Sequence, residues 1–230
     1  MRKPVLSSEW RAASGWALMM CLLLSACSSS PPPPDWKMNA VSLIEHFQES
    51  WLQGDGKTAT LALGKARGEI AKSGRIDLLA RAELAACATR TAALDFSPCV
   101  AYQKLGPEAD PRDAAYAHFI AGEWSGLDAK ALPSHYADLV GTRDEAAANS
   151  AAAAIQEPLP RLIAAALLFE RGAASPAIVA NAVDTASERG WRRPLLAWLQ
   201  VQLLRAQADT HAVARLQGRI DLIRSTAASD

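Results

Sequence analysis

Apolar residues recur at intervals of three and four along almost the whole chain after residue 36. This is the spacing of one face of an α-helix. Gly54-Asp55-Gly56 follows the first of these stripes and predicts the end of a helix there. Ser42 and Glu45 have the spacing of a capping box, which would place the helix start beside them. The stripe itself consists of Val41, Ile44, Phe47, Trp51 and Leu52.

The same periodicity continues to the C-terminus and is broken only by short Gly- and Pro-containing turns. No run of alternating β-branched residues is long enough to predict a strand. We therefore expect an all-α fold of stacked antiparallel helical hairpins. The next helices are predicted at residues 58–73, 75–94, 100–105 and from Pro111 onward, where Asp110 is the expected N-cap.

The C-terminal half repeats at a fixed offset of 34 residues, so that residues 160–186 align with 194–220. A unit of 34 residues is the period of the tetratricopeptide repeat, and residues 127–225 resemble a degenerate array of that family. The aromatic and glycine positions of the family's first helix are mostly absent, and an Ala-rich bundle of helical hairpins is the alternative. The matching positions are Pro160 with Pro194, Leu162 with Leu196, Arg171 with Arg205, Ser175 with Asp209 as N-caps, and Ala146 with Ala180 and Ala214.

The N-terminus has the three zones of a secretory leader, with basic residues first, an apolar run of eight residues at 17–24, and small residues after it. Leu24-Ser25-Ala26-Cys27 resembles the lipobox of bacterial lipoproteins at all four positions. The resemblance implies cleavage before Cys27 and acylation of that cysteine, which would anchor the protein in a membrane. It also implies a body facing the periplasm, and Ser28 after the cysteine favours the outer membrane over the inner membrane.

These features predict five segments. Residues 1–26 are the cleaved signal peptide, and residues 27–35 are the lipidated cysteine with a tether rich in Ser and Pro. The prolines favour an extended polyproline II conformation, so the tether would span roughly 20 Å. Residues 36–126 and 127–225 are two sets of helical hairpins, and residues 226–230 are a flexible tail.

The cysteines that remain after processing form an even pair. Cys21 would leave with the leader and Cys27 would carry lipid, which leaves Cys87 and Cys99 in an oxidising compartment. Within one continuous helix they would lie about 18 Å apart, beyond the reach of a disulfide. Ser97-Pro98 interrupts the helix between them, so two antiparallel helices could bring them together. We predict a disulfide, and two buried free thiols are the alternative.

Charge and motifs give little sign of chemistry. The chain has 24 basic and 24 acidic residues, and removal of the leader would leave a formal charge of −2. This balance lacks the basic footprint of nucleic-acid binding. The four histidines lie in separate predicted elements, and none has the spacing of a helical metal site. We therefore expect no catalytic residues, no metal, no cofactor and no enzymatic activity.

Trp191, Arg192 and Arg193 are the candidate partner surface, because Trp and Arg are frequent anchors in protein interfaces. The alternative is that Trp191 packs within the chain while the arginines are solvated. With the leader, the pattern predicts a lipid-anchored adaptor that binds other envelope proteins in an unspecified process. An enzyme or accessory factor acting on cell-wall or lipid material, and a small-ligand carrier, are the competing functions.

Overall fold

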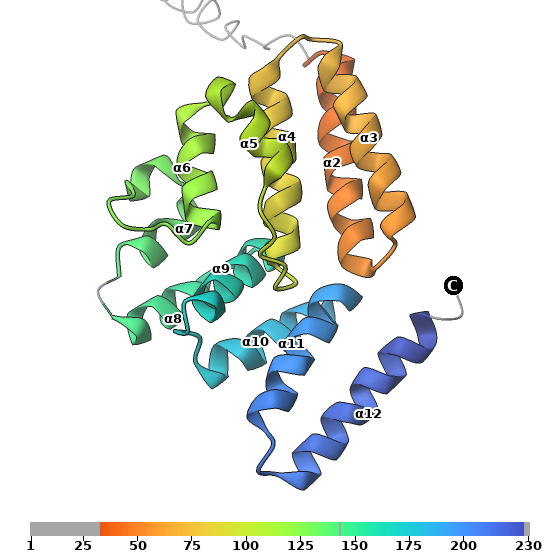
Figure 1. Ribbon diagram of the computed structural model, residues 1–230, viewed down its shortest axis with the longest axis vertical. Coiled ribbons are helices and arrows are strands. Elements are labelled where there is room, and N and C mark those ends of the chain that lie inside the picture. Colours follow the sequence, from red (N-terminus) through yellow and green to blue (C-terminus); the bar gives the residue numbers. More distant parts are fainter. Residues whose placement is uncertain (1–32, 143, 228–230) are drawn as a thin grey trace, which may run out of the picture. The chain divides into compact units, whose positions relative to one another are not determined.

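The structure is a computed structural model that describes residues 33–142 and 144–227. Within these residues it contains eleven α-helices, two short 3₁₀ helices and no strand, which confirms the predicted all-α class (Figure 1). The α-helices are α2 (Asp35–Gln53), α3 (Gly56–Ala71), α4 (Ile76–Thr91), α5 (Val100–Leu105), α6 (Pro111–Ile120), α7 (Ser134–Val140), α8 (Glu145–Ala154), α9 (Pro158–Glu170), α10 (Pro176–Glu188), α11 (Arg192–Arg205) and α12 (Thr210–Ala227). The 3₁₀ helices are η2 (Gly106–Glu108) and η3 (Ala129–Ala131).

The first helix starts earlier than predicted. α2 begins at Asp35, directly after the prolines, and an acidic residue in the first turn interacts favourably with the helix dipole. Ser42 and Glu45 therefore lie inside α2, and the predicted capping box is wrong. The predicted end is confirmed, since Gly54 follows α2 with φ +100°, a conformation that glycine adopts without strain.

Three other predicted N-caps are confirmed. The side chains of Asp110, Ser175 and Asp209 each accept a hydrogen bond from a backbone N–H two or three residues further on, at 2.8, 3.2 and 3.0 Å. Each bond satisfies a donor that has no partner within its own helix. These three caps fix the starts of α6, α10 and α12.

The 34-residue period appears in the positions of the helices. α11 begins 34 residues after α9, and α12 begins 34 residues after α10. α9 packs against α10, α10 against α11, and α11 against α12, which gives stacked helical hairpins. This agrees with the predicted hairpin architecture, while membership of the tetratricopeptide family stays a prediction.

The N-terminal helices pack closely because their contact faces carry small side chains. α2 and α3 form an antiparallel hairpin, and α4 contacts both (Figure 1). α3 turns Ala59, Ala62, Ala66 and Ile70 inward, each at most 5% exposed. The ion pair between Arg67 of α3 and the buried carboxylate of Glu83 on α4 connects the α2–α3 hairpin to α4.

The main hydrophobic core continues across residue 126, where the two predicted sets of hairpins meet. It joins Leu52 and Phe119 to Leu162 and Trp198 within the unit formed by residues 35–230. Trp198 is completely buried, and its indole N–H donates to the backbone carbonyl of Ala92 at 3.1 Å. The ring therefore ties α11 to the end of α4.

Cys87 of α4 and Cys99, the residue before α5, form the predicted disulfide, with Cα atoms 5.7 Å apart. The segment at Ser97-Pro98 is not helical and turns the chain back towards α4. The predicted break at this dipeptide is thus what brings the two cysteines together. The bond closes a loop across a separation of 12 residues.

Candidate functional site

The structure places Trp191 inside the chain. It directly precedes α11, is 4% exposed, and donates a hydrogen bond from its indole N–H to the Glu49 carboxylate at 2.9 Å. The Arg189 guanidinium lies 5.3 Å from the centre of the ring. Trp191 therefore packs between α11 and α2, as the alternative interpretation of this residue held.

Arg192 and Arg193 contact the end of α2. Arg192 donates from Nε to the backbone carbonyl of Gln53 at 2.8 Å, and the Arg193 guanidinium lies 4.6 Å from the centre of the Trp51 ring. Cations at the C-terminal end of a helix interact favourably with its dipole. Both arginines are half-buried in this junction. Their use by a partner stays a prediction. Cys27, the predicted lipid attachment site, lies outside the described residues.

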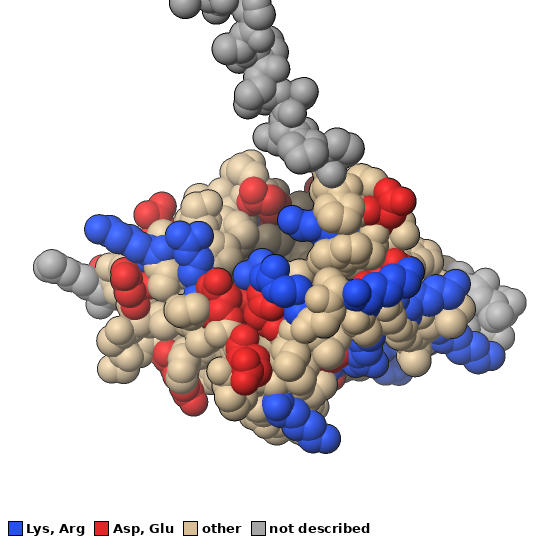
Figure 2. Space-filling model, turned by 90° about the horizontal axis from the view of Figure 1, so that it is seen from above, with Lys and Arg blue, Asp and Glu red and all other residues tan. Residues whose placement is uncertain are grey.

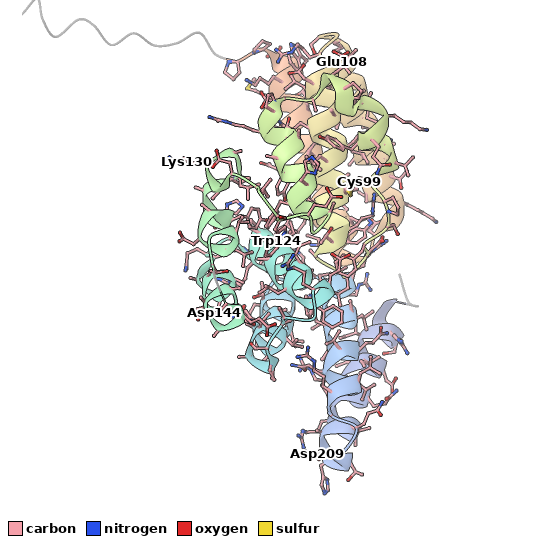
Figure 3. All side chains as sticks on the ribbon, turned by 60° about the vertical axis from the view of Figure 1, so that its left-hand side comes forward. Cys99, Glu108, Trp124, Lys130, Asp144 and Asp209 are labelled. Atoms are coloured by element: carbon pink, nitrogen blue, oxygen red, sulfur yellow. A yellow bond between two sulfur atoms is a disulfide. The ribbon has the colours of Figure 1, made fainter. Side chains whose placement is uncertain are left out.

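A cleft of about 690 Å³ lies on another part of the molecule, between the segment after α6, α7, the start of α8 and the end of α9. Its floor is apolar and is formed by Leu139, Val140, Ala148 and Leu168. Clefts of this size that combine buried apolar side chains with polar groups able to orient a ligand can serve as binding sites. Figure 3 labels Trp124 on one wall and Asp144 at the start of α8.

Trp124 and Arg171 form one wall. The indole N–H of Trp124 donates to the backbone carbonyl of Phe119 at 2.9 Å, and the two rings stack with centres 5.2 Å apart. The Arg171 guanidinium lies 4.4 Å from the centre of the Trp124 ring and donates to the carbonyl of Gly122 at 3.3 Å. A cation over an indole face is attracted by the ring's electron density. The wall is therefore held by contacts on several sides.

Three carboxylates stand at the rim. Asp144 accepts a hydrogen bond from the backbone N–H of Ala147 at 2.7 Å and so caps α8, and Glu145 is exposed in the first turn of that helix. Glu123 lies 2.6 Å from a ring nitrogen of His118. Among the described residues that line the cleft, Arg171 is the one cation opposite these carboxylates, so this part of the rim favours a cationic ligand.

The wider surface carries charge of both signs. Seen from the end at which α2 begins, basic and acidic side chains are interspersed over the face (Figure 2). The acidic rim of the cleft is made by residues on the segment after α6 and at the start of α8.

The cleft brings together residues that lie far apart in the sequence. Arg171 follows Trp124 by 47 positions, and neither was predicted as a site residue. Ser125, beside Trp124 in the sequence, also lines the cleft. The sequence signal for this cleft was a tryptophan, Trp124, beside a glycine-rich turn. Its cationic partner, Arg171, could not be predicted from the sequence.

No protein-family model, no curated protein and no solved structure matches this chain. Every helix within the described ranges is too short or too polar to span a bilayer. In the same part of the chain, no three His, Cys, Asp or Glu side chains are grouped so that they could hold a metal ion.

Proposed function

We propose that this protein is a lipid-anchored adaptor on the periplasmic side of the bacterial outer membrane, and that it binds an extended segment of another envelope protein. The observation that carries the proposal is the cleft of about 690 Å³ with an apolar floor and three carboxylates at its rim. Helical hairpin arrays commonly use such hollows to hold protein segments. The wider comparison with tetratricopeptide scaffolds is an analogy of fold.

The chemistry of the cleft specifies the segment. Its floor would bury apolar side chains, each a favourable contribution of roughly 25 cal/mol per Å² removed from water. Its rim would attract Lys or Arg, because Glu123 and Glu145 are exposed and carry the same sign of charge. The expected ligand is therefore a short extended segment that alternates apolar and basic residues.

Synthetic seven-residue peptides test this specificity. A peptide of alternating Leu and Lys should bind the full chain more tightly than the same peptide with Glu in place of Lys. Each exposed ion pair contributes up to about 1 kcal/mol, and Glu145→Lys replaces attraction by repulsion. The variant should therefore weaken binding of the Lys peptide about tenfold.

Glu108→Lys is the matched control. Glu108 is also exposed, but it precedes α6 whereas the cleft lies beyond the other end of that helix (Figure 3). It should leave peptide affinity unchanged. Equal affinity of the Lys and Glu peptides, or equal losses in the two variants, would count against the cleft as the binding site.

The anchor is tested separately. Cys27→Ser should abolish incorporation of radiolabelled palmitate and release the protein from the membrane fraction, because acyl chains supply the binding energy of such an anchor. Ser28→Ala leaves the predicted lipobox intact and serves as the control. Palmitate labelling that persists in Cys27→Ser would refute acylation at this residue.

A further inference from the structure

A second hollow, of about 390 Å³, lies between α4, the start of α6 and the 3₁₀ helix η3. Three cationic side chains from three different elements line it, namely Arg81, Arg112 and Lys130. Figure 3 labels Lys130 on its short helix. The convergence of three cations on one hollow requires an explanation, since like charges repel one another.

Local structure fixes where each of these cations stands. Arg81 donates from Nε to both carboxylate oxygens of Asp113, at 3.1 and 2.9 Å. Arg112 lies in the first turn of α6, whose start is set by the Asp110 cap and a proline. Lys130 lies in η3, where its own backbone N–H donates to the Asp128 carboxylate at 2.9 Å.

Two of the three charges are uncompensated. In the described ranges, neither Arg112 nor Lys130 forms an ion pair with a carboxylate, whereas Arg81 is paired with Asp113. Three cations and one carboxylate give the lining a net charge of +2. A compact dianion would balance this charge, and a single carboxylate ligand would not.

Carboxylates outside the lining also affect the electrostatics of this hollow. Burial raises the pKa of the Asp113 carboxyl, the Arg81 hydrogen bond opposes that rise, and the nearby charges of Asp110 and Asp77 add to it. Asp110 is itself engaged as the cap of α6, and Asp77 pairs with Arg75. Neither of these two carboxylates forms an ion pair with Arg112 or Lys130 in the described ranges.

We propose that this hollow is a binding site for a phosphate group, held by Arg112 and Lys130 with the Arg81–Asp113 pair as its inner wall. Guanidinium groups match the oxygens of phosphate geometrically, and a lysine ammonium adds a point charge. The volume of about 390 Å³ leaves room for a small organic group attached to the phosphate. The site is separate from the acidic cleft and would bind ligands of opposite charge.

Titration calorimetry with inorganic phosphate tests the proposal on the full chain in detergent micelles at low ionic strength. The double variant Arg112→Gln/Lys130→Gln should weaken phosphate binding at least tenfold. Its matched control is Lys104→Gln/Arg215→Gln, which removes the same charge at two exposed residues that do not line the hollow and form no ion pair in the described ranges. The control should bind phosphate as the parent chain does.

The binding results can be compared directly when circular dichroism shows equal helicity in the parent chain and the two double variants. No binding by the parent chain, or equal weakening in both double variants, would overturn the proposal. Soluble dihexanoyl phosphatidic acid, titrated in the same way, distinguishes the source of the phosphate. If it binds tenfold more tightly than inorganic phosphate and requires the same two residues, the ligand is a lipid headgroup; if it does not, the ligand is a free or small-molecule phosphate.

Discussion

Replacement of Trp191 by alanine should destabilise the whole fold, because the residue joins α11 to α2. Its side chain is 4% exposed and donates a hydrogen bond to Glu49, which is 142 positions away in the sequence. Truncation of a buried tryptophan to alanine typically costs about 3–5 kcal/mol of unfolding free energy. Glu49 is only half-buried, so water can replace the donor that the variant lacks. Loss of the hydrogen bond should therefore lower the unfolding free energy by about 1 kcal/mol more, at the low end of the usual range.

Trp191→Phe separates the two contributions. It keeps most of the ring contacts and removes the indole N–H, so it should cost about 1–2 kcal/mol. Leu204→Ala is the control, because Leu204 lies on α11, the helix that Trp191 precedes, but is 68% exposed. Substitutions at such positions usually change stability by less than about 0.5 kcal/mol.

Urea unfolding followed by circular dichroism measures all three variants, with the midpoint and slope fitted together. The predicted order of destabilisation is Trp191→Ala, then Trp191→Phe, then Leu204→Ala. An unfolding free energy of Trp191→Ala within 0.5 kcal/mol of the parent chain would refute the structural role. If such a stable variant also lost a protein partner, the surface interpretation of Trp191 would be correct.

Three further perturbations have expected outcomes. Cys99→Ser should lower stability by roughly 3 kcal/mol, the contribution of closing a loop of this size, and reductant should then have no further effect on unfolding. Asn149→Ala should cost about 1–3 kcal/mol in urea unfolding, since its amide makes two hydrogen bonds to the turn between α9 and α10. The Arg75 guanidinium lowers the pKa of Asp77 from 3.8 to about 2. The stabilisation from Asp77 is therefore complete above pH 3.8 and lost as pH falls to about 2, and Asp77→Asn should remove this part of the acid dependence of unfolding.

Sequence periodicity was sufficient for the all-α class and for several of the helix ends. Asp110, Ser175 and Asp209 cap their helices as expected, because a cap depends on residues only two or three positions apart. The disulfide also followed from a local feature, the break at Ser97-Pro98. The start of α2 was misplaced, because a plausible capping box at Ser42 competed with the earlier acidic start after the prolines.

Sites that depend on distant contacts could not be predicted in this way. From the sequence alone, Trp191 was equally compatible with a surface and an interior position. The structure decides between them, because the Trp191 indole donates a hydrogen bond to Glu49 of α2. The cleft required Arg171 to lie over Trp124, and the phosphate site required Lys130 to face α6. These juxtapositions are set by how α-helices pack, and the spacing of residues along one chain does not contain that information.

Site-specific photocrosslinking in intact cells tests the adaptor proposal at its binding surface. A photoreactive amino acid at Ser125, which is exposed and lines the cleft, should give a discrete protein adduct that mass spectrometry identifies. The same group at Glu108, away from the cleft, should not give this adduct, and Glu145→Lys should reduce the yield at Ser125. The absence of a protein adduct at Ser125, or identical adducts at both positions, would contradict the proposal that this cleft holds an envelope protein.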